Sequence, residues 1–376
     1  MKLSSICVHG AIDKNNRTGS LAVPIYQSAT YAHPGVGQST GYDYARVQNP
    51  TREALEGLMA ALEGGRYALA FSCGMSAMDA AMTLLAPGSH VICTEDLYGG
   101  SVRLLSVLKQ RLSFDVECLD TNDQTALQKA LRPETAAIFI ETPSNPTMRV
   151  TDIAAVRRTV GSDVKIIVDN TFLTPIFQRP LEFGADMVLH SGTKYLGGHN
   201  DTLAGFLIGN DLDDEEKLRF VTKTVGSGLT PFDSFMIIRG LKTLDLRMKK
   251  SQENALQIAV FLSHHPKVTK VRYPGLTDHP GRDISFRQTV GFGGMLSFSV
   301  DSKETAEKAL ERVKLILFAE SLGGTETLIT YPFLQTHADV PSETRARLGI
   351  DDKLLRLSVG IEDLEDLMAD LTQALA

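Results

Sequence analysis

The chain has 376 residues, of which 43% are hydrophobic and 22% are charged, which is typical of a soluble globular protein with two domains. Its net charge of −7 comes without a long run of one sign, which argues against a nucleic-acid partner. No apolar stretch is long enough to cross a bilayer, and the first residues lack the apolar core of a signal peptide. The four cysteines (Cys7, Cys73, Cys93 and Cys118) form no CxxC pair, so we expect reduced thiols in a cytoplasmic protein.

Residues 1–55 contain many turn formers and little periodic structure. They predict an extended N-terminal arm, and such an arm needs another surface to lie on.

Residues 56–235 alternate between short strand-like runs and helical stretches, which predicts a large domain; a cofactor site is expected in it from the loops described below. Both faces of each run are apolar, so the expected fold is α/β, with a mostly parallel central sheet and helices on both faces. The expected strands are 67–71, 91–93, 137–140, 165–168, 187–189 and 205–208, and the expected helices are 75–85, 100–111, 123–131 and 153–160.

Residues 236–376 predict a smaller α+β domain at the C-terminus. A helical period over 234–264 leads into it, and 362–376 has the pattern of a closing amphipathic helix. Strands are expected at 268–271, 295–300 and 355–359. The run 295–300 roughly alternates, so we expect a sheet with one solvated face.

Five polar or glycine-containing loops follow the predicted strands of the large domain. Ligands bind at the carboxyl ends of strands in an open parallel sheet, so these loops should meet at one edge. They are 72–75, 96–100, 141–146, 169 and 191–194. Lys194 is flanked by hydroxyls and glycines, and Asp169 ends an apolar run. Pyridoxal phosphate (PLP) needs such a pair, because a lysine carries its Schiff base and an acid holds its pyridinium nitrogen.

Other residues fit the same ligand, each with an alternative. A phosphate would suit the helix start at Gly74 and Met75, which could otherwise be a simple helix cap. Tyr98 could stack on the cofactor ring or be a half-buried turn residue. Arg356 lies inside an apolar run, where it could clamp a substrate carboxylate or form a structural salt bridge. No metal site is predicted, because the histidines and cysteines lack a ligand spacing.

From end to end the chain resembles the Cys/Met-metabolism (transsulfuration) family of PLP-dependent enzymes, which have fold type I. The motifs that carry this resemblance are Tyr42–Arg46 with Asn49–Arg52, Ser72–Met75, Asp96–Gly100, Glu141–Pro146, Val168–Thr171, Ser191–His199, Ser321–Gly324 and Leu355–Gly360.

The resemblance implies a role for each matched residue. Lys194 would bind the cofactor and transfer protons, with Tyr98 as a second catalytic residue. The implied cofactor-binding residues are Tyr44 and Arg46 (toward a neighbouring subunit), Gly74, Met75, Tyr98, Asn145, Asp169, Thr171, Ser191, Thr193 and Lys194. The implied substrate-binding residues are Arg356, Ser321, Asn145, Asp43 and Glu326. Family members are usually homotetramers of two dimers that share active sites, and Cys73 stands where a serine is common.

The same resemblance favours one reaction among several. Gly100 stands where methionine γ-lyases place cysteine, and Asp43 and Glu326 could hold a second ammonium group or be plain surface acids. The segments 231–234, 330–332 and 335–337 look most like bacterial cystathionine γ-synthases or O-acylhomoserine (thiol)-lyases. The expected reaction is therefore γ-replacement, in which cysteine and an O-acylhomoserine give cystathionine. The alternatives are a cystathionine β- or γ-lyase and a non-catalytic binding protein of the same fold; a dehydrogenase is disfavoured, because the glycine-rich fingerprint is missing.

Overall fold

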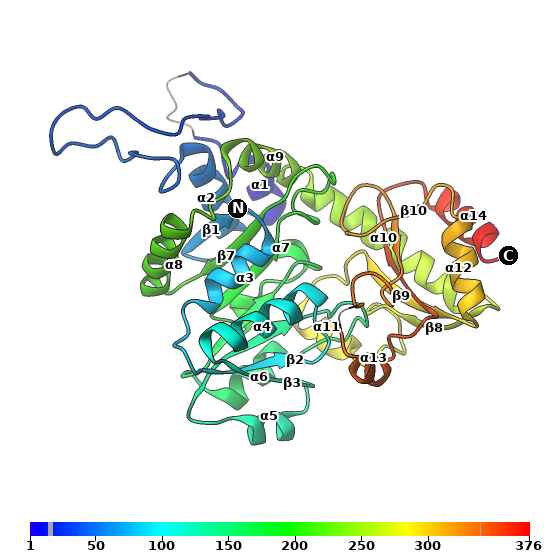
Figure 1. Cartoon of the computed structure of the whole chain (residues 1–376). Coiled ribbons are helices and arrows are strands. Elements are labelled where there is room, and N and C mark those ends of the chain that lie inside the picture. The colour runs from blue at the N-terminus through cyan, green and yellow to red at the C-terminus, as the bar shows by residue number, and fades with distance from the viewer. Residues whose placement is uncertain (14–17, 339) are drawn as a thin grey trace.

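The computed structural model describes residues 1–13, 18–338 and 340–376, and these residues form two sheets (Figure 1). The larger sheet has seven strands in the order β1-β7-β6-β5-β4-β2-β3. Their bounds are Tyr67–Phe71 (β1), His90–Thr94 (β2), Asp115–Leu119 (β3), Thr135–Glu141 (β4), Lys165–Asp169 (β5), Met187–Ser191 (β6) and Gly205–Gly209 (β7). Among these described strands β7 runs opposite to the other six, so the mostly parallel α/β sheet is confirmed.

Helices cover both faces of this sheet, as expected. One face buries the apolar sides of α3 (Gly74–Met82), α4 (Gly99–Leu112) and α8 (Leu212–Val225). The other face packs against α2, α5, α6, α7 and α9. Their bounds are Pro50–Glu63 (α2), Gln124–Ala130 (α5), Ile153–Val160 (α6), Thr174–Phe177 (α7) and Pro231–Leu241 (α9), and a 3-10 helix spans Pro180–Phe183 (η1).

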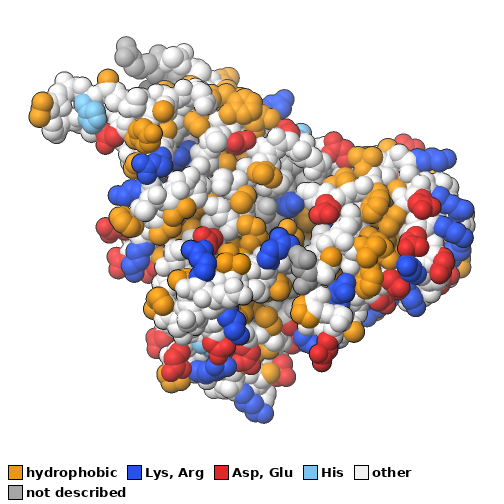
Figure 2. Space-filling view, in the orientation of Figure 1, with side chains coloured by type: hydrophobic (Ala, Val, Ile, Leu, Met, Phe, Trp, Pro, Cys, Tyr) orange, Lys and Arg blue, Asp and Glu red, His pale blue; other side chains and the backbone are white. Residues whose placement is uncertain are grey.

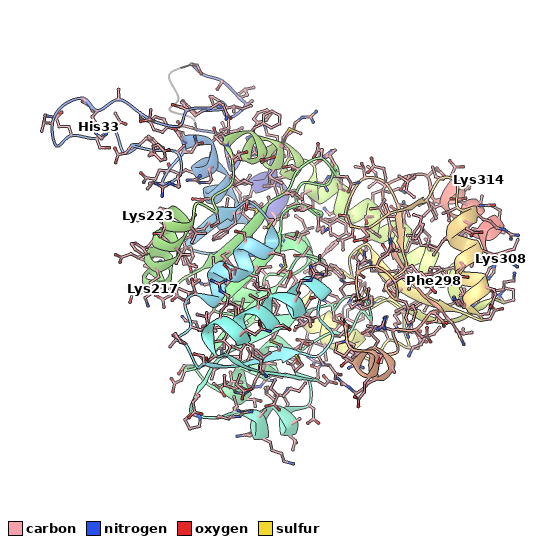
Figure 3. The ribbon with its side chains drawn as sticks, in the orientation of Figure 1. His33, Lys217, Lys223, Phe298, Lys308 and Lys314 are labelled. Atoms are coloured by element: carbon pink, nitrogen blue, oxygen red, sulfur yellow. The ribbon has the colours of Figure 1, made fainter. Side chains whose placement is uncertain are left out.

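The second sheet has five strands in the order β10-β11-β12-β9-β8. Their bounds are Val268–Arg272 (β8), Met295–Val300 (β9), Leu317–Phe318 (β10), Leu328–Thr330 (β11) and Leu354–Ser358 (β12). Three helices share its apolar core, in which Phe298 is buried (Figure 3): α10 (Leu244–Ser263), α12 (Lys303–Arg312) and α14 (Leu364–Ala374). Two shorter helices, α11 (Arg282–Gln288) and α13 (Ser342–Leu348), complete this part of the chain.

The expectation of a solvated face along 295–300 is wrong, because every residue of β9 is buried. The serines that produce the alternating pattern face other parts of the protein. Ser297 donates a hydrogen bond to the carbonyl of Pro146 at 2.7 Å, and Ser299 accepts one from Arg272 at 2.9 Å. The polar side of this strand is thus covered by the loop after β4 and by β8.

The N-terminal segment is an arm only in part. Helix α1 (Leu3–His9) and the first turns of α2 fall within 1–55, so the expected lack of periodic structure is wrong there. The Asn49-Pro50 pair is a helix start, because Asn49 caps the helix and proline occupies its first position. Part of the described segment 18–48 projects from the body of the molecule in Figure 1, and His33 lies on it in Figure 3. The division into domains at 55 and 235 remains a prediction.

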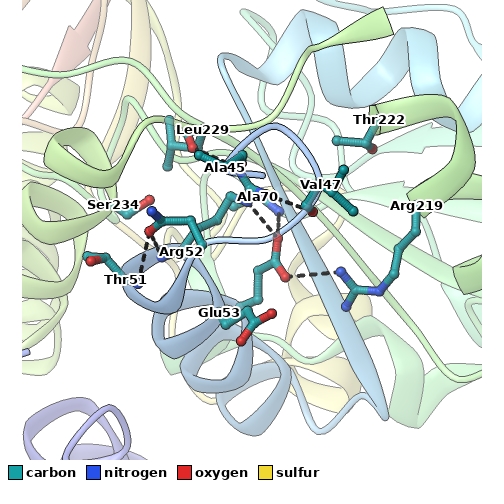
Figure 4. Close-up of polar contacts among 12 residues, drawn as sticks. Ala45, Val47, Thr51, Arg52, Glu53, Ala70, Arg219, Thr222, Leu229 and Ser234 are labelled. Atoms are coloured by element: carbon teal, nitrogen blue, oxygen red, sulfur yellow. Dashed lines mark hydrogen bonds and ion pairs between the residues drawn. The ribbon is translucent and has the colours of Figure 1, made fainter. Parts of the chain in front are cut away.

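A buried ionic cluster fixes the base of this arm (Figure 4). Arg52 donates hydrogen bonds to three backbone carbonyls, those of Ala45, Val47 and Leu229, at 3.0, 3.0 and 3.3 Å. Glu56 lies 3.8 Å from the Arg52 guanidinium and accepts a 3.0 Å hydrogen bond from the backbone of β1. The chain just before α2 is therefore held against the large sheet.

None of the helices in the described ranges is both long and apolar enough to cross a membrane. On the face seen in Figure 2, acidic and basic side chains are interspersed.

Candidate active site

A cavity of about 430 Å³ lies where the carboxyl ends of the large sheet meet the smaller sheet. The predicted loops converge on it. The predicted site residues that line it are Gly74, Met75, Tyr98, Asn145, Asp169, Thr171, Ser191, Thr193, Lys194, Ser321 and Arg356. The juxtaposition follows from topology, because parallel strands deliver their last residues to one edge of a sheet.

One end of the cavity can receive a phosphate. Helix α3 starts there at Gly74, and Cys73 caps it by accepting a 3.4 Å hydrogen bond from Ser76 N–H. A β-carbon at Gly74 would lie 3.0 Å from Cβ and 3.1 Å from Cα of Ser191, so only glycine leaves this approach unobstructed. The unpaired N–H groups at the start of α3 and the Ser191 hydroxyl are donors suited to an anion.

A second group of cavity residues, Asp169 and Thr171, suits a cationic ring nitrogen. Asp169 ends β5, and Thr171 donates to its Oδ1 from the backbone N–H at 3.0 Å and from the hydroxyl at 2.5 Å. Burial raises the pKa of Asp169, whereas those two donors and the charge of His190 lower it. A carboxylate removed from water gains most from a cation placed against it, and a protonated pyridine nitrogen is such a cation.

Glu141 is a second buried acid that the sequence did not single out as functional. It is the register partner of Asp169 on the adjacent strand β4. Its carboxylate accepts hydrogen bonds from the backbone N–H groups of Tyr98 at 3.0 Å and Asn145 at 2.9 Å. Burial, followed by the charge of Asp169, raises the pKa of Glu141 well above its usual range. Glu141 thus anchors both loops that carry Tyr98 and Asn145, and its place at the end of a predicted strand was the available signal.

Lys194 reaches into the cavity from the loop after β6. Its Nζ donates a 2.8 Å hydrogen bond to Ser321 Oγ. Burial lowers the pKa of Lys194 to about 8, the charge of Arg356 lowers it as well, and Glu320 opposes the shift. This pKa leaves an appreciable fraction of neutral amine near pH 7, which a nucleophile or a base requires.

Arg356, on β12, is only 2% exposed. Its guanidinium donates to Asn145 Oδ1 at 2.8 Å, to the carbonyl of Ser321 at 2.9 Å and to Thr330 Oγ1 at 3.2 Å. Within the described ranges all these acceptors are neutral, and Arg356 Nε has no partner. Burial lowers the pKa of Arg356 to about 10, which still leaves it cationic at neutral pH. The alternative that Arg356 forms a structural salt bridge therefore loses support, and its guanidinium is available to the carboxylate of a ligand.

Four predicted site residues lie elsewhere in this chain. Arg46 is stacked over the Tyr44 ring at 5.5 Å and donates to the carbonyl of Lys223, a residue labelled on α8 in Figure 3. Asp43, also on the arm, accepts a 2.6 Å hydrogen bond from Ser39. The fourth, Glu326, accepts a 2.8 Å hydrogen bond from Asn200.

The prediction of Glu326 as the acid at the cavity is not supported within one chain. The acid of that region that lines the cavity is Glu320, immediately before Ser321. Ser101 and Thr336 also line it and were not anticipated. None of the three belongs to a pattern that sequence periodicity could single out.

Gly100 is fixed by its neighbours. A β-carbon at this position would clash with the Tyr98 ring and would lie 3.1 Å from Met75 Sδ. Any larger residue here requires the Tyr98 ring to move, so Gly100 helps to set the position of that ring over the cavity.

The fold and the cavity define a PLP-dependent enzyme of fold type I. Residues 4–376 match the family model described as Cys/Met metabolism PLP-dependent enzyme. The chain belongs to this family, and it is a transsulfuration enzyme of the cystathionine synthase and lyase group, with PLP as cofactor. The resemblance to this family, inferred from the sequence motifs, is thus confirmed.

Similar proteins differ in the reaction that their names state. The chain is 48% identical to cystathionine gamma-lyase of Bacillus subtilis (strain 168), over 100% of this chain and 99% of that protein. It is 46% identical to cystathionine gamma-synthase of Haemophilus influenzae, over 96% and 94% of the two chains. A solved structure of cystathionine gamma synthase from Xanthomonas oryzae pv. oryzae, in complex with aminoacrylate and cysteine, has a TM-score of 0.97 at 40% identity, covering 100% of this chain and 98% of that one.

Proposed function

We propose that this chain makes cystathionine by γ-replacement, using cysteine to displace the acyl group of an O-acylhomoserine. The placement of three charges around one cavity supports a reaction of two amino acids, and the segments 231–234, 330–332 and 335–337 favour the synthase among such reactions. Arg356 suits the α-carboxylate of an amino acid, Lys194 suits proton transfer at its Cα, and Glu320 suits the ammonium group of a second amino acid.

PLP supplies an electron sink for the charge left when the Cα proton departs. Asp169 would pair with the ring nitrogen and favour its protonated form, and the start of α3 with Ser191 would hold the phosphate. Arg356 orients the amino acid through its carboxylate, so that the Cα–H bond faces Lys194. The Lys194 amine takes this proton, and its hydrogen bond to Ser321 fixes the direction of the amine. Tyr98 lines the same cavity and would move a second proton.

We infer that the arm completes the site of a neighbouring copy, in a homotetramer of two site-sharing dimers. Tyr44 is 46% exposed, and it lies with Arg46 outside the cavity of its own chain. An exposed tyrosine and arginine with no local core to join are suited to another surface, and a guanidinium suits a phosphate. Asp43, next to them, would then approach the neighbour's substrate.

Subunit mixing tests the shared site. Arg46→Ala and Lys194→Ala variants should each be inactive or nearly so. Unfolded and refolded together, they should regain activity, because one site of each mixed dimer receives an intact Lys194 and an intact Arg46. No regain, with mixed dimers demonstrated by differently tagged chains, would contradict the shared site without affecting the reaction proposed.

Product analysis tests the direction of the reaction. The holoenzyme is given O-acetyl- or O-succinylhomoserine, each with and without cysteine. The proposal predicts cystathionine as the main product when cysteine is present. Absence of cystathionine from both esters would overturn it.

A lyase is the second candidate, favoured by the 48% identity to the Bacillus subtilis cystathionine gamma-lyase. Glu320 and Arg356 would bind cystathionine itself equally well, since it carries both an ammonium group and a carboxylate at each end. Rapid release of 2-oxobutyrate from cystathionine alone would establish a γ-lyase, and pyruvate a β-lyase. A purified protein that stays colourless with added PLP would instead support a binding protein.

A further inference from the structure

Two cysteines outside the active site face each other across neighbouring strands. Cys93 on β2 and Cys118 on β3 are direct register partners in a parallel pair. Residues opposite each other on adjacent strands have Cα atoms about 5 Å apart, which lies inside the range of about 4.4–6.8 Å that a disulfide accepts. Both thiols are free, and they lie close enough for each to shift the pKa of the other.

The two thiols differ in their access to solvent. Cys93 is fully buried, whereas Cys118 is exposed. Cys118 lies on β3, the last strand at its edge of the seven-stranded sheet within the described ranges. The neighbouring Cys93 thiol lowers the pKa of Cys118, although partial desolvation of the Cys118 sulfur opposes this. The same contact, together with full burial, raises the pKa of Cys93. A solute therefore meets Cys118 first, and in its more reactive form.

The remaining cysteines lack this arrangement. Cys7 is 2% exposed, and burial raises its pKa to about 11. Cys73 is occupied as the cap of α3 at the cavity. Neither faces another cysteine in the described parts of the chain.

We propose that Cys118 and Cys93 form a reversible redox site, in which a hydroperoxide oxidises Cys118 and Cys93 resolves the product as a disulfide. The Cys118 thiolate attacks a peroxide oxygen, so an S–O bond forms, the O–O bond breaks and hydroxide or alkoxide leaves. The Cys93 sulfur, having released its proton, then attacks the sulfenic sulfur, and the hydroxyl leaves as water. For hydrogen peroxide, two thiols and one peroxide give one disulfide and two waters, a two-electron oxidation.

The position of β3 makes this bond accessible without rearranging the core. An edge strand has a strand neighbour on one side only, so β3 can shift toward β2 more freely than a central strand can. The disulfide would also protect Cys118, because a resolved sulfenic acid does not proceed to the irreversible sulfinic and sulfonic acids.

Peptide mapping of the holoenzyme tests the proposal. The protein is exposed to hydrogen peroxide, denatured in a thiol-blocking reagent and digested with trypsin plus a protease that cleaves before aspartate. Cleavage before Asp79 separates Cys73 from Cys93, and cleavage at Arg111 separates Cys118 from both. The expected product is a Cys93–Cys118 cross-linked peptide pair, lighter than the sum of the two reduced peptides by two hydrogen atoms and split by a reductant.

Two variants give each step its own readout. In Cys93→Ser, Cys118 should stop as a sulfenic acid that a sulfenic-specific probe captures. In Cys118→Ser, Cys93 should keep its free thiol at the same peroxide dose. Three results in the wild-type protein would overturn the proposal. One is over-oxidised Cys118 beside a Cys93 that carries the thiol-blocking reagent and so stayed reduced. The others are oxidation of Cys73 before Cys118, and a cross-link between any other pair of cysteines.

Discussion

Replacing Arg356 tests whether its buried cation serves a substrate carboxylate. In Arg356→Ala the substrate loses a desolvated, hydrogen-bonded charge pair, a loss of about 2–5 kcal/mol. At about 1.4 kcal/mol per tenfold, kcat/KM should fall by about 30-fold to about 4,000-fold. Arg356→Lys should lie between wild type and alanine, because it keeps a charge but not the fork that also reaches Asn145, Ser321 and Thr330.

The assay separates lost binding from lost structure. Steady-state kinetics on an amino-acid substrate is compared with binding of an amine analogue that lacks the carboxylate, which should bind wild type and Arg356→Ala alike. Arg272→Ala is the matched control, since Arg272 also donates to neutral groups in the same sheet but does not line the cavity. A loss below about threefold, or an equal loss for the analogue or the control, would refute a carboxylate clamp.

Three further predictions concern the other charges of the cavity. A Lys194 pKa of about 8 leaves about a tenth of the amine neutral at pH 7, which is about 300 times the neutral fraction of a lysine with the ordinary pKa of 10.5. The rate at which the apoenzyme captures PLP should therefore rise with pH through about 8 and then level off. Because Glu320 raises the pKa of Lys194, Glu320→Gln should move this midpoint to lower pH and raise the KM for cysteine or cystathionine; an unchanged or higher midpoint would contradict the assignment. Asp169→Asn breaks a buried charge pair that costs about 3–5 kcal/mol to break, so kcat should fall by at least about 100-fold, and a smaller loss with PLP still bound would show that Asp169 does not control the ring.

Much of the large sheet could be predicted from the sequence, because β1, β2 and β4–β7 are buried on both faces and read as continuous apolar runs. Strand β3 was missed since Asp115 and Glu117 interrupt its apolar pattern, which an edge strand tolerates. The helical period over 234–264 is two helices, because the chain turns between Leu241 and Leu244. Local periodicity does not distinguish one long helix from two that share an apolar face.

Some residues of the site could likewise be predicted from the sequence, and others could not. Lys194 and Asp169 could be found because Asp169 ends an apolar strand and Lys194 lies in the loop just after one, where parallel topology places functional groups. Glu320 could not, because it belongs to an irregular segment between β10 and β11 that reaches the cavity only through tertiary folding. Glu326 was a plausible acid in the same segment. It lies six residues after Glu320, and its side chain accepts a hydrogen bond from Asn200, whereas Glu320 lines the cavity. The arm residues Tyr44 and Arg46 depend on a second copy, which no single-chain pattern specifies.

Reductive trapping tests the central assignment most directly. Holoenzyme is treated with borohydride, digested and mapped by mass spectrometry, which locates any lysine joined covalently to PLP. A single modified peptide with the coenzyme on the Lys194 ε-nitrogen is the predicted result. Coenzyme attached to a different lysine, or bound with no covalent link to any lysine, would contradict the site described above.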